Sequence, residues 1–180
     1  MKYYNLFVLT ALLVLGGCGQ DTLTGVAEDG DARFVAKNEL KTVPFEGYMD
    51  GYGWFNLSRT DCPTGSLPLD AIGAGEGSHI GAYEIFFEIC SYAQVDPTNP
   101  TYVGTATITA AKGDELYVSY NGVATSPTTY REFDTVIGGT GRFENASGAF
   151  EHTGTFGPHP AGFSLASIFT GEISSVGSSK

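Results

Sequence analysis

The stretch VIGGTGRFENASGAF, from Val136 to Phe150, decides the fold of this chain. Its glycines could form either a phosphate-binding loop or a turn that reverses a strand. A phosphate-binding loop leads into the N-terminus of a helix, but the residues after Gly141 are too rich in Asn, small residues and Gly to form one. Glycines 138, 139 and 141 can take the positive φ angles that hairpin turns and bulges require. We therefore predict a strand reversal and not an anion site.

Alternation of apolar and polar residues predicts strands on both sides of this turn. Between residues 81 and 90 the odd positions are apolar and the even positions include both acids, so the odd side chains should face a core. The same period recurs in 101–110, 115–124 and 130–137, and turn-forming residues separate the runs. These features predict one all-β domain over residues 43–180, either a sandwich or a barrel.

The N-terminus, MKYYNLFVLTALLVLGGC, has the features of a targeting segment. Its apolar run from Leu6 to Leu15 is shorter than the ~20 residues that a membrane-spanning helix needs, so we predict a secretory signal peptide over residues 1–17. The run ends in Leu-Gly-Gly-Cys, which resembles the lipobox of bacterial lipoproteins. That resemblance implies acylation of Cys18 and attachment to the bacterial cell envelope, at the outer membrane if the cell has one. An ordinary cleaved signal is the alternative.

Residues 18–42 carry few large apolar groups and no sustained period, so we expect an acylated N-terminus followed by a flexible tether. The formal net charge of the whole chain is −11 at pH 7, with no run of Lys or Arg. An acidic protein is repelled by nucleic acid and by anionic lipid, so neither is an expected partner. The expected membrane contact is through the acyl chains on Cys18.

Two cysteines remain once Cys18 is assigned to lipid. Cys62 and Cys90 form an even pair in an exported domain, which predicts a disulfide; two separate buried thiols are the alternative. The chain has no Cys-x-x-Cys or His-rich spacing that indicates zinc. We therefore predict no metal site and no cofactor.

The run TVIGGTGRFENASGAF, preceded by KGDELYVSYNG, resembles the glycine-rich signature of the allene oxide cyclase and dirigent-like barrels, and of bacterial lipoproteins that share this barrel. The matching residues are Gly138, Gly139, Thr140, Gly141, Arg142, Phe143, Ala146 and Gly148. The resemblance implies an eight-stranded antiparallel barrel of the calycin or dirigent-like type, whose partly apolar interior can hold one small ligand. It does not imply the activity of those families, because a shared fold does not fix chemistry.

Strand parity also selects candidate binding residues. Tyr83, Tyr102 and Tyr120 fall on inward faces, and His79 falls at the start of the same face as Tyr83. In one interpretation these tyrosine rings fill the core and bond to backbone. In the other, the tyrosines and His79 line a pocket and orient a ligand. No residue is predicted to be catalytic.

The function that we expect is therefore a non-catalytic envelope lipoprotein whose barrel binds a small apolar molecule or acts as an interaction module. Two alternatives stay open. The first is an isomerase or cyclase acting on a fatty-acid-like or phenolic substrate. The second is a structural or adhesive envelope protein with a filled core.

Overall fold

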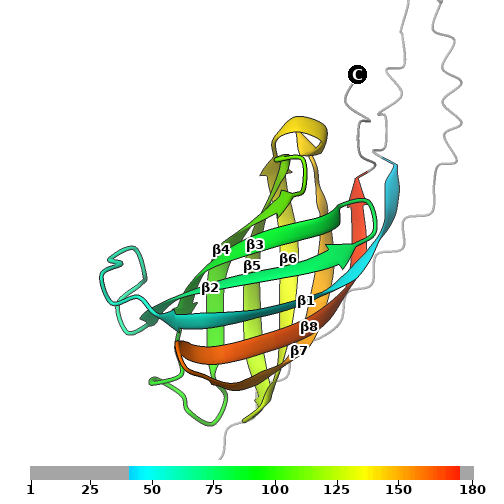
Figure 1. Ribbon diagram of the computed structural model, residues 1–180. Coiled ribbons are helices and arrows are strands. Elements are labelled where there is room, and N and C mark those ends of the chain that lie inside the picture. Colours follow the sequence, from blue (N-terminus) through cyan, green and yellow to red (C-terminus); the bar gives the residue numbers. More distant parts are fainter. Residues whose placement is uncertain (1–40, 175–180) are drawn as a thin grey trace, which may run out of the picture. The chain divides into compact units, whose positions relative to one another are not determined.

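The computed structural model describes residues 41–174, and this part of the chain forms a closed β-barrel (Figure 1). The strands are β1 (Thr42–Phe55), β2 (Leu67–Gly77), β3 (Gly81–Ser91), β4 (Thr101–Ala110), β5 (Glu115–Ser126), β6 (Thr129–Gly139), β7 (Gly148–His159) and β8 (Gly162–Ser174). Each strand pairs antiparallel with its neighbours in sequence. β1 also pairs with β8, from Thr42 opposite Ser174 to Gly53 opposite Phe163, which closes the barrel. The predicted eight-stranded antiparallel barrel is confirmed.

The interior of the barrel follows the predicted alternation. On β3, Tyr83, Ile85 and Phe87 are buried, whereas Glu84 and Glu88 are exposed on the outer face. The inward faces of β4 and β5 are also those expected from the sequence, with Ile108 and Leu116 buried. Burial of these side chains supplies the main driving force for folding.

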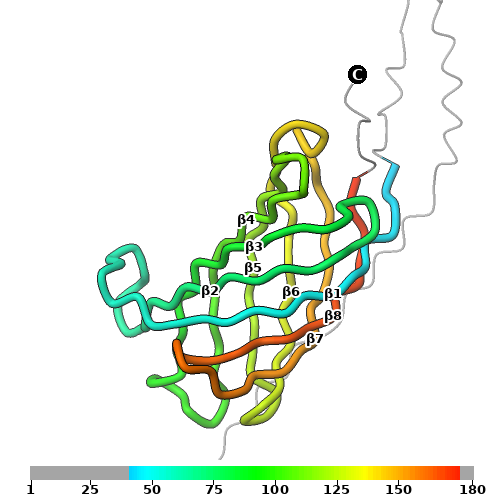
Figure 2. Tube along the Cα trace, in the orientation of Figure 1, coloured from blue at the N-terminus to red at the C-terminus, as the bar shows by residue number. Residues whose placement is uncertain are grey.

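The connections gather at two ends, because successive antiparallel strands run in opposite directions (Figure 2). Loops 56–66, 92–100, 127–128 and 160–161 lie at one end, which we call the mouth end. Turns 78–80, 111–114 and 140–147 lie at the other, the plugged end, together with the start of β1 and the end of β8.

The lone arginine of the opening sequence stretch helps to close the plugged end. Phe143, in the short 3-10 turn η1 (Gly141–Phe143), is 1% exposed and packs into the core. The Arg142 guanidinium lies over the Phe143 ring at 4.7 Å and donates a hydrogen bond from Nη2 to the Ile80 carbonyl at 2.9 Å. Its Nε lies 3.4 Å from Asp114 Oδ2. One side chain thus links all three turns, so this stretch is a structural closure.

The glycines of the same stretch serve the turn in two ways. Gly138, Gly141 and Gly148 take positive φ angles of 139°, 57° and 147°. Gly139 does not, so that expectation is wrong for this residue. A Cβ at Gly139 would instead collide with the Glu115 carbonyl and lie 2.7 Å from Phe143 Cβ, so the close approach of β6 to β5 and to η1 requires glycine there.

The mouth end is held by covalent and ionic contacts. The predicted Cys62–Cys90 disulfide is confirmed, with the two Cα atoms 5.5 Å apart, and it joins loop 56–66 to β3. Arg59 in the same loop contacts Asp61 at 2.6 Å and the buried Asp70 of β2 at 2.9 Å. These contacts fix the loop beside the barrel rim.

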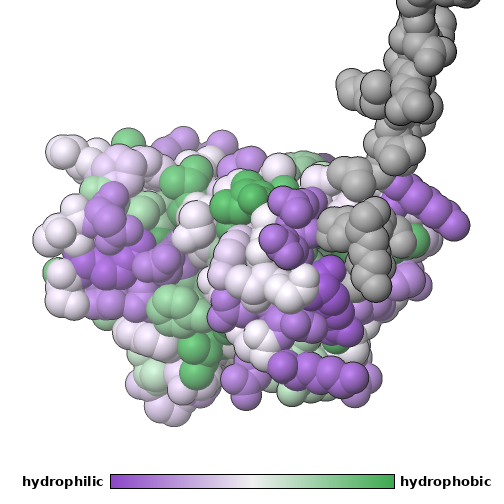
Figure 3. All heavy atoms as spheres, turned by 90° about the horizontal axis from the view of Figure 1, so that it is seen from above, coloured by the Kyte–Doolittle hydropathy of each residue, from purple (hydrophilic) through white to green (hydrophobic). Residues whose placement is uncertain are grey.

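The outer face of the barrel is mixed in character. Figure 3 shows one side, where hydrophobic groups stand between hydrophilic ones. Exposed large apolar side chains include Tyr48, Phe86 and Ile168. The described residues contain no helix long and apolar enough to cross a membrane. The predicted signal peptide, Cys18 and nearly all of the predicted tether lie outside the described residues.

Candidate ligand pocket

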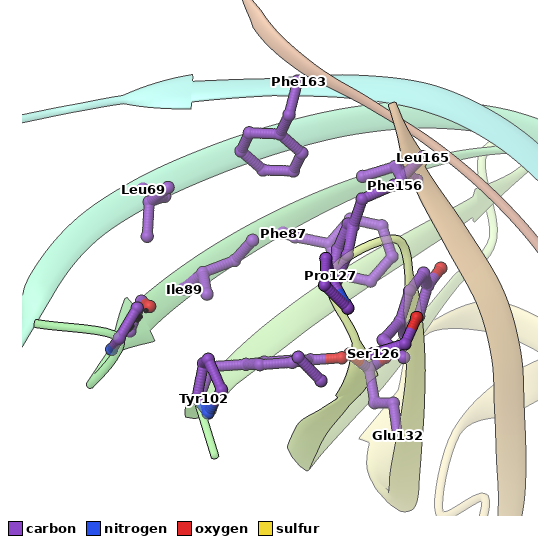
Figure 4. A pocket seen from close by; sticks show the side chains of 15 residues that line it. Leu69, Phe87, Ile89, Tyr102, Ser126, Pro127, Glu132, Phe156, Phe163 and Leu165 are labelled. Carbon is purple, nitrogen blue, oxygen red and sulfur yellow. Dashed lines mark hydrogen bonds between the residues drawn. The ribbon is translucent and has the colours of Figure 1, made fainter. Parts of the chain in front are cut away.

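A pocket of about 300 Å³ lies inside the barrel at the mouth end (Figure 4). Its lining is mostly aliphatic and aromatic, with few polar groups. The lining residues are Leu69, Phe87, Ile89, Ser91, Ala93, Pro100, Tyr102, Ala124, Ser126, Pro127, Tyr130, Glu132, Phe156, Phe163 and Leu165. A mostly apolar concavity of this size with a few polar groups is typical of a small-molecule site.

Aromatic rings form much of the pocket wall. Phe156 stacks on Tyr130 with ring centroids 4.6 Å apart and meets Phe163 edge to face at 6.1 Å. On the other side, Tyr102 packs edge to face against Tyr120 at 6.2 Å. Figure 4 shows Phe163 and Leu165 across the pocket from Tyr102. Such packed rings hold the cavity open because each is fixed by its neighbour.

Cross-strand glycines position the tyrosines. Tyr102 lies opposite Gly122, and Tyr130 lies opposite Gly154. A Cβ at Gly122 would collide with the Tyr102 ring, and a Cβ at Gly154 would lie 2.6 Å from Tyr130 Cζ. The absence of these side chains lets each ring lie close against the neighbouring strand, where it lines the pocket.

A buried polar cluster adjoins the pocket. Glu132 and Asp134 of β6 and His152 of β7 are 4%, 3% and 2% exposed. Glu132 and His152 are direct cross-strand partners, and His152 Nδ1 lies 3.8 Å from Glu132 Oε1. Ser167 Oγ of β8 lies 3.5 Å from the same imidazole nitrogen. Glu132 belongs both to this cluster and to the pocket lining, so the two features are continuous.

Burial dominates the protonation of this cluster. It raises the pKa of Glu132, against the smaller opposing effects of Tyr102 and Asp134. It also raises the pKa of Asp134, and the neighbouring Glu132 adds to that rise. Burial lowers the pKa of His152 to about 4. All three shifts favour the uncharged form of each group, as expected for ionisable side chains in an apolar interior.

Tyr83 and Tyr120, two of the four binding residues predicted from the sequence, fill the core. The Tyr83 hydroxyl donates a hydrogen bond to the Tyr48 carbonyl at 3.1 Å, and the Tyr120 hydroxyl donates one to the Glu88 carbonyl at 3.1 Å. Neither tyrosine lines the pocket. These two follow the first interpretation, in which buried rings bond to backbone.

The other two indicated residues lie at opposite ends of the barrel. Tyr102 lines the pocket at the mouth end. His79 lies in turn 78–80 at the plugged end, where it is exposed and takes a positive φ of 63°. Its expected place on the inward face beside Tyr83 is wrong, because β3 begins only at Gly81 and the turn rotates His79 outward.

Comparisons with known proteins give a fold likeness only. No protein-family model matches the chain, and no curated protein does. The barrel is similar to the solved structure of the pterocarpan synthase dirigent protein GePTS1, with 14% sequence identity and a TM-score of 0.45, over 78% of this chain and 88% of that chain. Similarity at this level says nothing about activity, so the function has to be argued from the pocket.

Proposed function

We propose that this protein is an envelope-anchored bacterial lipoprotein whose barrel binds one small, neutral, apolar molecule in the mouth-end pocket. The observation that carries this proposal is the pocket itself, an aromatic-walled cavity of about 300 Å³ in which Glu132 is the one carboxyl group among the described lining residues. Its size suits a molecule of up to about three rings, and apolar ligand surface buried against its walls contributes about 25 cal/mol per Å² to binding.

The electrostatics of the pocket favour a neutral ligand. The chain carries a formal charge of −11, and Glu132 and Asp134 lie at or beside the pocket. An anionic ligand would lose its hydration in a region of low dielectric, where no described lining residue is a Lys or Arg that could pair with its charge. Free fatty acids are therefore disfavoured, and a neutral molecule with one hydroxyl or carbonyl group could hydrogen-bond to Tyr102 or Glu132.

The direction of the chain is compatible with anchoring through Cys18. β1 begins at Thr42 at the plugged end, so the N-terminal segment enters the barrel at the end opposite the pocket. The point where that segment joins the barrel is therefore not at the mouth end. The proposal of lipid attachment itself rests on the sequence around Cys18.

Filling the pocket tests this function. Ala124 lines the pocket, so Ala124→Phe should place a ring inside it and weaken binding of the neutral dye N-phenyl-1-naphthylamine at least tenfold. Ala82→Phe is the matched control, because Ala82 is exposed outside the pocket. Native mass spectrometry of the wild type from its own envelope should also detect a bound small molecule. Equal dye binding by a folded Ala124→Phe variant and the wild type would refute the proposal.

A second candidate function is isomerisation or cyclisation of the bound molecule. Glu132 favours it, because a buried carboxyl at a pocket wall can exchange a proton with a ligand. Incubating the recovered molecule with wild type and Glu132→Gln, followed by chromatography, separates the two functions. Conversion by the wild type and not by the variant would indicate catalysis, whereas an unchanged molecule in both samples would indicate binding alone.

A further inference from the structure

The cluster formed by Glu132, Asp134 and His152 has the composition of a metal site. Each side chain offers one ligand atom, and these three atoms all lie within 4.8 Å of one another. Carboxylate oxygen and imidazole nitrogen are ordinary ligands of zinc, manganese and iron. Because the three residues come from two different strands, β6 and β7, no short sequence motif identifies the cluster.

The hydrogen bonding of the cluster is incomplete. Glu132 Oε1 and Asp134 Oδ2 are buried without a hydrogen-bond partner. No ion pair in residues 41–174 joins either carboxyl group to a Lys or Arg. A buried polar atom without a partner costs about 1–3 kcal/mol, so two of them in one cluster need an explanation. A bound cation would supply the missing partner for both.

The surroundings restrict the position of the imidazole. The His152 ring stacks on Phe169 with centroids 5.3 Å apart and packs against Phe150 at 5.5 Å. Its Nδ1 atom is the nitrogen within 3.8 Å of Glu132. The strand pairing of Glu132 with His152 fixes the two backbones. Only small side-chain rotations are needed to reach the ~3.4 Å ligand spacing that a tetrahedral ion ~2.1 Å from each ligand requires.

We propose that Glu132, Asp134 and His152 bind one divalent transition-metal cation, of the zinc or manganese type, inside the barrel. Binding would release to solvent the protons that burial favours on Glu132 and Asp134. The two carboxylates would then neutralise the ion's charge, and His152 Nδ1 would be the third ligand. A fourth position would face the pocket, because Glu132 also lines that cavity. Three protein ligands with an open position are typical of a reactive zinc site and not of a structural one.

Other cations and another cluster fit less well. Calcium takes six to eight oxygen ligands and magnesium keeps several waters, whereas this cluster offers two carboxylates and an imidazole among aromatic rings. Asp61, Cys62 and Cys90 also lie close together, but both sulfurs are in the disulfide and cannot act as thiolate ligands.

The proposed metal site does not depend on the ligand proposed for the pocket, because dye binding and metal binding are measured separately.

Metal titration tests the proposal. Purified full-length protein is stripped with chelator, dialysed and titrated with zinc chloride and with manganese chloride by calorimetry. The wild type should take up one equivalent of at least one of these ions, and Glu132→Gln/Asp134→Asn should bind it at least ~100-fold more weakly, because both anionic ligands are lost. Glu84→Gln/Glu88→Gln is the control, since it removes the same number of carboxyl groups from the outer face of β3 and should bind like the wild type.

Weak binding at exposed histidines or at a free Cys18 would be the same in all three proteins, so only the difference between variants counts. The absence of stoichiometric uptake of either ion by the wild type would overturn the proposal, as would equal affinity in the wild type and Glu132→Gln/Asp134→Asn. If the double variant does not fold, zinc-soaked crystals of the wild type decide the question. An anomalous peak between the three side chains supports the site, and a peak only elsewhere, or none, overturns it.

Discussion

Replacing Gly141 by alanine tests whether the glycine-rich turn serves the fold. Gly141 has a φ of +57°, and an alanine forced into that region costs roughly 1–2 kcal/mol. The new Cβ would also collide with the Asp114 carboxylate and displace it from Arg142. Loss of this half-exposed ion pair costs at most about 1 kcal/mol, and local repacking adds about 1 kcal/mol. We therefore expect a total destabilisation of about 2–4 kcal/mol.

Thermal unfolding followed by circular dichroism measures this effect. At roughly 4 °C per kcal/mol for a domain of this size, Gly141→Ala should lower Tm by roughly 8–16 °C. Gly81→Ala is the matched control, because Gly81 has a φ of +74° but nothing within 4 Å of its would-be Cβ. That variant should lose only the conformational part, roughly 4–8 °C.

A double-mutant cycle with Asp114→Ala isolates the collision. In the Asp114→Ala background the cost of Gly141→Ala should fall to about that of Gly81→Ala, because the atoms it would strike are gone. Equal costs for Gly141→Ala and Gly81→Ala in the wild-type background would refute the reasoning. So would a Gly141→Ala cost that is unchanged when Asp114 is absent.

Three further predictions concern the mouth end and the anchor. Cys62→Ser/Cys90→Ser should lower the free energy of unfolding by roughly 3 kcal/mol, because the disulfide closes a loop with a sequence separation of 28 residues; an unchanged urea midpoint would contradict this. Gly122→Ala should cost about 1–3 kcal/mol and weaken dye binding, because the new methyl group displaces the Tyr102 ring from the pocket wall; dye affinity equal to the wild type would count against that role. A palmitate analogue should label the wild type but not Cys18→Ser in cells, and equal labelling of both would exclude acylation at this residue.

The strands and turns could be predicted because their signals are local. Alternation over residues 81–90 gave the inward face of β3, and the same rule gave Tyr102 and Tyr120 their inward directions. The disulfide could be predicted because only two cysteines remain once Cys18 is assigned to lipid. The expected inward position of His79 is wrong because His79 precedes the first residue of β3 and lies in a turn, where the period of two does not apply.

The buried cluster could not be predicted because it depends on the register of β6. Alternation along 130–137 predicts a strand without fixing which face points inward. The face that points outward carries Phe133 and Ile137, which are 42% and 59% exposed. Hydrophobicity alone therefore favours the wrong parity for this strand. Tyr120 points inward and lies directly opposite Asp134, so Asp134 also points inward in the observed register.

That register includes an irregularity that no sequence rule fixes. The pairing of β5 with β6 shifts between Tyr117 and Val118, opposite Gly138 with its positive φ. A shift of one residue moves every side chain of a strand to the other face. With this shift and a second one between Ala124 and Ser126, Glu132 and Asp134 point into the barrel, and Phe133 and Ile137 point out. β6 exposes two apolar side chains and buries two acids, which is the reverse of the usual pattern for a strand. Such reversals are expected where a functional site, and not core packing, determines the residue types. This reversal on β6, together with the unpaired carboxyl oxygens, is why Glu132, Asp134 and His152 are the residues to mutate first.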